Sequence, residues 1–270
     1  MIIGRERVFY LGLLGVPSER ALGASILYSS LSRPFNLCVD GVWQSRWLAM
    51  VPPYQAHRIS TEDGLISAIL LEPEAVDLGR VRDWIDCVSG DAQRARILAG
   101  RIRRAYGALH DHGGGTLPAT WDLDRLFLGR PLPSPILDAR VARVVRAMQA
   151  DPRSLHTARD CAAGAGLSFS RFLHLFKRET GVSFRKFRAW KRARGVLYHV
   201  NRPHSMTEVA LEAGYPDAAH FSRCVRQVYG LCPSDIFAGS RRLPILFQGL
   251  GIPGVPGPAP LTLRVVGKGV

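Results

Sequence analysis

Two copies of one short pattern lie 48 residues apart in the second half of this 270-residue chain. Residues 157–166 can be laid over residues 205–214, because small residues and a final glycine fall at matching places. Phe172 lies over Phe221 at an offset of 49, so the second copy has one extra residue in its turn. A repeat of this length cannot bury its apolar face alone, which restricts this half to units that pack together.

Each copy has the signals of a short helix, a sharp turn and a second helix. Thr157 and Ser205 can cap the first helix, because an acid with capping-box spacing follows three residues later in each copy. Glycines can end helices with positive φ, and they stand at Gly166, Gly181, Gly214 and Gly230. The spacing therefore predicts two helix-turn-helix units, joined by one basic helix from about residue 184 to residue 200.

Positive charge is concentrated in the same half of the chain. Residues 1–134 carry 15 Arg and no Lys against 14 acids, whereas residues 135–242 carry 19 Lys and Arg against 8 acids. Residues 243–270 add two basic residues and no acid, and the whole chain has a formal charge of +14. A basic half beside a nearly neutral half is typical of a protein that binds a polyanion with one half and has another task in the other.

Two long segments of the basic half carry a specific motif. They are residues 166–182, GLSFSRFLHLFKRETGV, and residues 213–223, AGYPDAAHFSR. With them, the chain from about 137 to 238 resembles the AraC/XylS class of bacterial transcription regulators. The resemblance implies seven helices, two of which enter adjacent major grooves of double-stranded DNA. The chain departs from the class at Val225, where an aromatic residue is usual, and at Lys191, where the joining helix is usually apolar.

The same motif indicates which residues face DNA. Exposed residues near the N-terminus of a recognition helix reach base edges, and the candidates are Ser170, Arg171, Leu173, His174, Ala218, Ala219, His220, Ser222 and Arg223. Arg223 is the strongest of them because arginine donates two hydrogen bonds to guanine; a phosphate contact is the alternative. Other basic residues are expected to contact phosphates without reading sequence, and these are Lys177, Arg178, Arg185, Lys186 and Arg226.

The aromatic residues of the basic half allow two interpretations. They could stack on the bases of a single strand, but their helical spacing predicts a hydrophobic core instead, and they are Phe172, Phe176, Phe187, Trp190 and Phe221. Cys161 and Cys224 fall at helical core positions too, so we expect unreactive thiols.

The first half opens with short apolar runs that are typical of β-strands. Residues 35–39 and 42–47 flank Asp40-Gly41, a pair that favours a two-residue type I′ turn, and residues 48–51 and 65–71 are further candidates. Such short, closely spaced strands predict a small sandwich or barrel. Within 79–110 apolar residues recur at three- and four-residue steps, which predicts helix, at Ala95, Leu98, Ile102, Ala105 and Leu109.

These patterns predict an α+β chain of four parts. We expect a small N-terminal β-barrel over 1–78, a helical dimerisation and linker region over 79–134, an all-α domain with tandem helix-turn-helix units over 135–242, and a Pro- and Gly-rich tail over 243–270. The tail is expected to be largely disordered, although its segment PILFQGLGI is apolar enough to dock on the rest of the chain. The stiff segment PLPSP at 131–135 marks the boundary before the third part.

The β region also resembles a cupin-type sensor. Pro52 and His57 keep the spacing of the second cupin motif, although Tyr54 stands at its glycine. A metal site needs three or four ligands and His57 is the region's single histidine, so we expect no metal and no other cofactor. His110 and His112 are expected in a solvated loop. Five side chains could line a pocket for a small effector or be ordinary core, namely Tyr28, Trp43, Trp47, Tyr54 and His57.

The leading hypothesis is a sequence-specific regulator that binds double-stranded DNA as a homodimer and responds to an effector through its first half. A constitutive architectural DNA-binding protein is the alternative, and RNA polymerase is a candidate partner. An enzyme is not expected, because Cys38 is the one candidate nucleophile of the β half and no basic neighbour marks it. The chain has no Cys-x-x-Cys pair and lacks an apolar run of the roughly 20 residues that a membrane helix needs, so we expect a reducing cytoplasm and no membrane contact.

Overall fold

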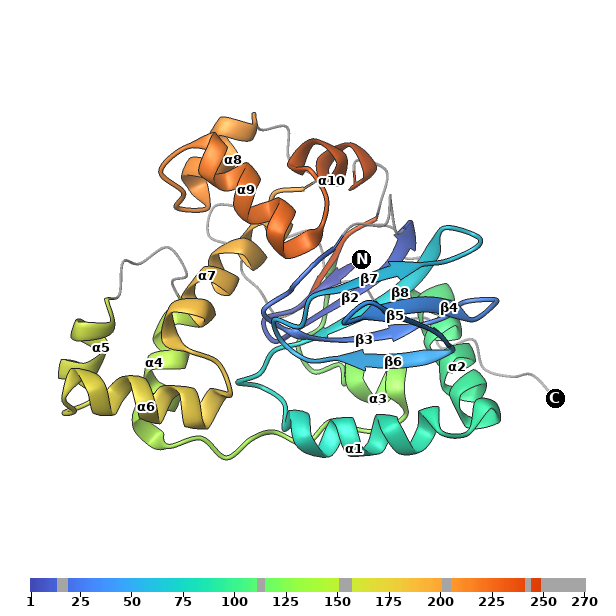
Figure 1. The fold of residues 1–270 in the computed structure, drawn as a ribbon, viewed down its shortest axis with the longest axis horizontal. Coiled ribbons are helices and arrows are strands. Elements are labelled where there is room, and N and C mark those ends of the chain that lie inside the picture. Colours follow the sequence, from blue (N-terminus) through green and yellow to red (C-terminus); the bar gives the residue numbers. More distant parts are fainter. Residues whose placement is uncertain (14–18, 111–114, 151–156, 201–204, 241–243, 249–270) are drawn as a thin grey trace.

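The computed structural model describes residues 1–13, 19–110, 115–150, 157–200, 205–240 and 244–248. Strands covered by helices on one face form one part of the molecule, and a group of helices forms the other part (Figure 1). This arrangement confirms the predicted α+β class, in which a β region comes first in the chain and an all-α region follows it.

The described strands form two sheets. The larger sheet has the order β6-β3-β8-β2-β1-β10-β9, and the smaller has the order β5-β4-β7. The strands of the larger sheet are β1 (Ile2–Ile3), β2 (Arg7–Leu13), β3 (Ser25–Ser29), β6 (Leu48–Val51), β8 (Leu65–Leu71), β9 (Gly115–Leu117) and β10 (Leu246–Gln248). Those of the smaller sheet are β4 (Phe35–Val39), β5 (Val42–Arg46) and β7 (His57–Ser60).

The hairpin of β4 and β5 forms where the Asp40-Gly41 pair predicts it. Both turn residues have positive φ, 50° at Asp40 and 81° at Gly41, which is the conformation that a type I′ turn requires. Val39 pairs with Val42 directly across the turn. The strands predicted at 48–51 and 65–71 are present as β6 and β8.

The expected barrel takes the form of two sheets that face each other in the described part of the chain. Arg20, in the segment before β3, forms an isolated bridge with His57 of the smaller sheet. One apolar cluster fills the space between the sheets, with Ile26 from the larger sheet and Phe35 from the smaller. The sequence pattern missed β3, because all five of its residues are buried. A strand buried on both faces lacks the alternation that identifies strands in a sequence.

Strands β9 and β10 differ from the expected division of the chain. β9 lies in the part 79–134 that was expected to be helical, and β10 lies in the part 243–270 that was expected to be disordered. β10 runs parallel to both of its neighbours, with Leu246 opposite Ile2 of β1. Ile245 and Leu246 are buried in the hydrophobic cores, which gives this apolar segment a reason to dock. The tail from residue 249 onward lies outside the described residues.

Three helices cover the outer face of the larger sheet, namely α1 (Leu78–Ser89), α2 (Ala92–His110) and α3 (Leu123–Leu128) (Figure 1). All five residues of the predicted helical period are buried there, in a cluster with Phe9 and Ile69 of the sheet. The larger sheet is therefore buried on both faces. Among the described residues, no helix has the length and apolar character needed to cross a membrane.

The second half contains the two predicted helix-turn-helix units, α5–α6 and α8–α9. Its described helices are α4 (Ala139–Ala150), α5 (Ala158–Gly164), α6 (Phe169–Thr180), α7 (Phe184–Gly195), η1 (Val196–Tyr198), α8 (Met206–Glu212), α9 (Ala218–Tyr229) and α10 (Pro233–Ser240). Thr157 and Ser205 both form complete capping boxes. The four predicted glycines have φ between 65° and 75°, so both turns are built as the repeat predicts.

Helix α7 joins the two units and packs against the β region (Figure 1). Its first turns bury Phe184 and Phe187 in the core of the first unit. Farther along, Trp190 and Ala193 are buried in the cluster that fills the space between the sheets and continues into the second unit. One helix of 12 residues thus contributes to the cores of both units and of the β region.

A buried group of charges holds α7 at the end of β8. Glu72 accepts hydrogen bonds from Trp190 Nε1 at 2.8 Å and from Lys191 Nζ at 2.7 Å. Its other oxygen forms an ion pair with Arg194 Nε at 2.6 Å. Glu74 forms an ion pair with the same Lys191. All four charged side chains are at most 7% exposed, so water does not screen these interactions.

The two glutamates respond differently to burial. Burial favours the neutral form of Glu72, but the charges of Lys191 and Arg194 outweigh that effect and lower its pKa. Burial prevails at Glu74 and raises its pKa. Because buried charges are tolerated only with partners, the two glutamates also explain why a lysine interrupts the apolar pattern of the joining helix at position 191.

Tyr54 provides a second contact between the β region and α7. Its φ of 63° is left-handed, a conformation that costs a residue with a side chain roughly 1–2 kcal/mol. Its hydroxyl donates a hydrogen bond to the carbonyl of Lys186, and the Lys186 ammonium lies 4.7 Å from the centre of its ring. Tyr54 thus has a backbone conformation that glycine adopts more readily, and its contacts with α7 offset the strain.

We expect Glu72→Gln to lower the free energy of unfolding by about 3–5 kcal/mol, because it leaves buried cations short of a negative partner. Chemical denaturation of the full chain measures the loss. The control is Glu62→Gln, which removes an ion pair to Arg33 whose side chains are 67% and 73% exposed and should cost ~1 kcal/mol or less. Small, equal losses in the two variants would contradict a buried cluster.

Gly23→Ala should loosen the packing of α7, because a methyl group there would overlap Trp190 and lie 2.6 Å from Tyr54 Oη. Overpacking of this kind costs about 1–3 kcal/mol. In the control Gly107→Ala of α2, the added methyl group meets no atom within 4 Å, so better helix propensity should stabilise the chain by ~1 kcal/mol. Thermal unfolding separates the two, and an unchanged Tm for the Gly23 variant would show that Trp190 does not pack against this residue.

Candidate nucleic-acid interface

Helix α6 presents the predicted base-contacting residues of the first unit. Ser168 caps the helix by accepting a hydrogen bond from the Arg171 amide. Ser170, Arg171 and His174 are exposed, and Leu173 is half-buried beside them. Residues three and four positions apart share a face of a helix, so these side chains form one stripe that points away from the apolar side of α6.

Helix α9 presents the corresponding residues of the second unit. Ala219 and Arg223 are exposed, and the three other candidates are partly exposed, namely Ala218, His220 and Ser222. Asp217 caps the helix by accepting a hydrogen bond from the His220 amide at 2.7 Å. Val225, which replaces the usual aromatic residue, is fully buried, so the departure lies in the core and leaves the exposed stripe unchanged.

All five predicted phosphate contacts are exposed. Two of them have partners within the chain, because Arg178 forms an ion pair with Glu179 at 3.0 Å and Lys186 lies on the ring of Tyr54. Lys177, Arg185 and Arg226 form no ion pair with any described residue. These three side chains are therefore available for a polyanion.

The five aromatic residues that were predicted to form a hydrophobic core lie in one. All five are at most 1% exposed, and Phe176 makes edge-on contacts with Phe184 and Phe187. They cannot act as stacking platforms for a single strand in this arrangement. Burial raises the thiol pKa of Cys161 and of Cys224, which disfavours the thiolate, the reactive form of cysteine.

The structure brings together only two of the five predicted effector-binding residues. Tyr28 Oη lies 3.0 Å from His57 Nε2 in the space between the sheets. Burial raises the pKa of Tyr28 and lowers that of His57 to about 4, so the imidazole is neutral at physiological pH. Trp43 is 48% exposed on β5, and Trp47 contacts Arg96 of α2. Tyr54 faces α7, so the five do not converge on one site and their effector role stays a prediction.

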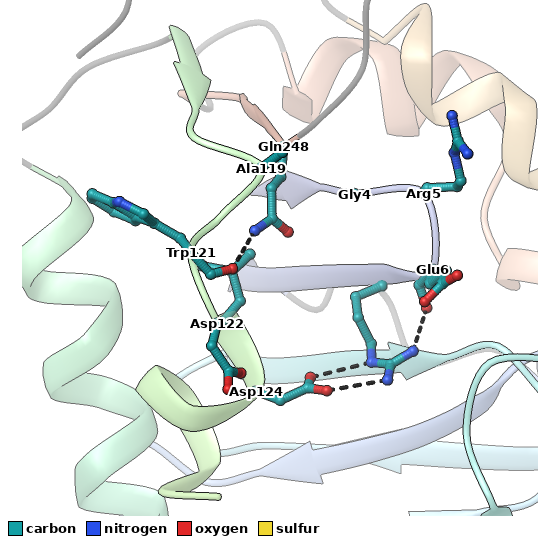
Figure 2. Close-up of a pocket in the computed structure, with 10 residues that line it drawn as sticks. Gly4, Arg5, Glu6, Ala119, Trp121, Asp122, Asp124 and Gln248 are labelled. Carbon is teal, nitrogen blue, oxygen red and sulfur yellow. Dashed lines mark hydrogen bonds and ion pairs between the residues drawn. The ribbon is translucent and has the colours of Figure 1, made fainter. Parts of the chain in front are cut away.

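A surface pocket of about 280 Å³ lies elsewhere, between the β1–β2 turn, the loop before α3 and β10 (Figure 2). Arg7 donates hydrogen bonds of 3.2 and 3.1 Å to Asp124, and Gln248 donates one of 2.6 Å to the carbonyl of Trp121. The predicted effector-binding residues do not line this pocket. Its best-placed polar groups bind one another, so it does not indicate a ligand.

No group of three or more His, Cys, Asp and Glu side chains in the described ranges could hold a metal ion. The predicted loop around His112 lies outside the described residues. All five cysteines are free.

Sequence reasoning missed three buried charged residues of the first half, namely Arg20, Glu72 and Glu74. The lysine at 191 was the one signal for the two glutamates, because a charge within an apolar helix face needs a buried partner. The sequence did not indicate that Arg20 is buried, because the acidic side chains near a residue depend on the folded arrangement of the chain.

Comparison with known proteins gives one match in sequence and several in structure. Residues 161–239 match the helix-turn-helix domain family, a span that runs from α5 to α10. No curated protein matches the chain in sequence. An AraC-type DNA-binding domain from Chromobacterium violaceum is 23% identical and covers 39% of this chain and 94% of its own, with a TM-score of 0.36.

Two crystal structures of ToxT from Vibrio cholerae match along most of the chain. The apo form of a single-residue variant from strain SCE256 has a TM-score of 0.56 and 11% identity, over 87% of this chain and 97% of its own. ToxT from strain O395 has a TM-score of 0.53 and 11% identity, over 87% of this chain and 98% of its own. The chain therefore has the fold of ToxT, and its residues 161–239 belong to the helix-turn-helix domain family, of the AraC type.

Proposed function

We propose that this chain is a transcription regulator that binds double-stranded DNA sequence-specifically through α6 and α9 and responds to an effector through its first half. The observation that carries the proposal is the matched exposure of the two helices. Each buries its predicted core aromatic residues, Phe172 and Phe176 on α6 and Phe221 on α9, and has its predicted base-contacting residues in an exposed or partly exposed stripe. Two such helices can read successive major-groove segments, which lie about 34 Å apart on B-DNA.

The charge of the second half supports binding to the DNA backbone. Lys177, Arg185 and Arg226 are exposed on three different helices, so they can contact phosphates at more than one place on the duplex. Such contacts position a protein on the duplex and make its affinity depend on salt, while base contacts select the sequence.

The contacts of α7 support a response to an effector. Glu72 and Tyr54 of the β region hold the helix that joins the two units. A ligand that binds one arrangement of the β region more tightly than another could therefore bias the placement of both units. The alternative is a constitutive architectural protein, which the dense packing of the predicted effector-binding residues Tyr28 and His57 favours.

In-vitro selection of duplex DNA with the full chain, repeated over a salt series, tests the proposal. We expect a motif of two short blocks about one helical turn apart, and a two-fold related pair of such motifs if the chain binds as a homodimer. Strong, salt-dependent binding without an enriched motif would reject sequence-specific regulation and favour the architectural alternative.

Arg223→Ala should weaken binding to the selected site by about 1–3 kcal/mol and relax the preference at one base pair. Lys177→Ala is the matched control, because it removes a cation of the first unit that is expected to touch phosphate. That variant should weaken binding to all sequences alike and reduce the slope of log K against log salt by about one. Titrations of selected and scrambled duplexes measure both effects, and an equal loss on both duplexes would make Arg223 a phosphate contact.

A further inference from the structure

Phe169 is an exposed aromatic residue at the start of a helix that the proposed function places in DNA. It is the first residue of α6, directly after the Ser168 cap, and it is 47% exposed. The core cluster of the first unit includes Leu167 and Leu173 among its partly buried neighbours, but not Phe169. Helices α5 and α6 lie at the end of the molecule away from the sheets (Figure 1). The apolar surface of this ring is therefore open to a partner.

The internal repeat aligns Phe169 with a residue that is predicted to contact bases. At the offset of 49 residues between the two recognition helices, Phe169 corresponds to Ala218. Each is the first residue of its helix, and each follows a residue whose side chain caps that helix. Because Ala218 is a predicted base-contacting residue, the repeat indicates that the equivalent residue of the first unit faces the major groove as well.

The neighbours of Phe169 are suited to the same surface. Leu173, a predicted base-contacting residue, follows one helical turn later on the same side of α6. The guanidinium carbon of Arg159, an exposed residue of α5, lies 5.6 Å from the centre of the Phe169 ring. The first helix of a helix-turn-helix unit crosses the DNA backbone, so Arg159 can contact a phosphate while the ring beside it contacts a base.

Position distinguishes Phe169 from the other exposed apolar residues. Isolated apolar side chains are common on protein surfaces and need no partner. Ile136 and Leu211 are even more exposed, but Ile136 precedes α4 and Leu211 lies on α8. Among the large apolar residues that are exposed in the described part of the chain, Phe169 is the one that lies on α6 or α9.

We propose that Phe169 reads a thymine, through contact of its ring with the C5-methyl group in the major groove. That methyl group is the apolar feature that a base edge presents there. The phenylalanine side chain has no hydrogen-bonding group, so it cannot read the donors and acceptors of the other bases. The contact would remove apolar surface of both the ring and the methyl group from water.

This inference deepens the sequence-specific part of the proposed function and rests on it. It also predicts a difference between the two units, because Ala218 has only a methyl group where α6 has a ring. The DNA block read by α6 should therefore carry a thymine preference that the block read by α9 has more weakly or not at all.

Parallel in-vitro selections from one random duplex library, with the full chain and with its Phe169→Ala variant, test the inference. We expect the variant to lose the preference for one thymine in one block and to keep the rest of the motif. Phe169→Leu retains an apolar side chain and should keep part of that preference. Ile136→Ala removes an apolar residue that is 98% exposed outside the recognition helices, and it should select the same motif as the unchanged chain.

Replacement of that thymine by deoxyuridine tests the methyl group itself, because both bases pair with adenine and differ only in the C5-methyl group. We expect the replacement to weaken binding of the full chain by about three- to fivefold, the effect of one buried methyl group. Binding of Phe169→Ala should not change. Titrations of both duplexes with both proteins at one salt concentration form a double-mutant cycle. The two duplexes are compared within each protein, so a change in the stability of the variant does not affect the result.

The outcomes separate this inference from the proposed function. An unchanged motif for Phe169→Ala, or an equal loss from deoxyuridine in both proteins, would overturn the role of Phe169 and leave the regulator standing. A variant that weakens binding to all sequences alike would make Phe169 a contact to the DNA backbone, which also overturns the inference. If neither selection enriches a motif, sequence-specific regulation is rejected, and the reading of thymine is rejected with it.

Discussion

The pairing of two acids with two cations at the end of β8 determines how the halves of this molecule are arranged. Glu72 lies in the interior and can stay ionised only where Lys191 and Arg194 reach it. Opposite charges without water between them tolerate little displacement, whereas apolar contacts alone would let α7 slide. The cluster therefore fixes the rotation and register of α7, and everything attached to α7 follows.

The two helix-turn-helix units are consequently not equivalent, although they share one pattern. The first unit has its own core, to which α7 contributes two phenylalanines. The core of the second unit is continuous with the cluster between the sheets through Trp190 and its neighbours. The boundary at residue 135 separates a nearly neutral half from a basic half. The hydrophobic core does not divide there, because one cluster contains residues from both halves. The β region and the second unit share one core, and the first unit is attached to them through α7.

The sequence predicted correctly those structural features that depend on residues close together in the chain. The Asp40-Gly41 turn, the two capping boxes and the period of α2 depend on neighbours within a few residues, and all are present. The exposed stripes of α6 and α9 follow from the same helical period. Strand β3 could not be found because burial on both faces removes its alternation. The sequence could not show that Arg20 lacks an acidic partner among the described residues either, because that depends on how distant parts of the chain are arranged in the fold.

The position of β10 in the larger sheet means that folding of this sheet depends on the order in which the chain is synthesised. Ile2 pairs with Leu246, and the Met1 ammonium donates a hydrogen bond to the carbonyl of Pro244 at 2.8 Å. The larger sheet therefore lacks an inner strand until residues 246–248 have been synthesised, and closing so long a loop is slow. During that interval β1 and β9 have open edges, and open strand edges invite pairing with other chains. All residues of the two helix-turn-helix units are therefore synthesised before the larger sheet, which begins at residue 2, can be completed.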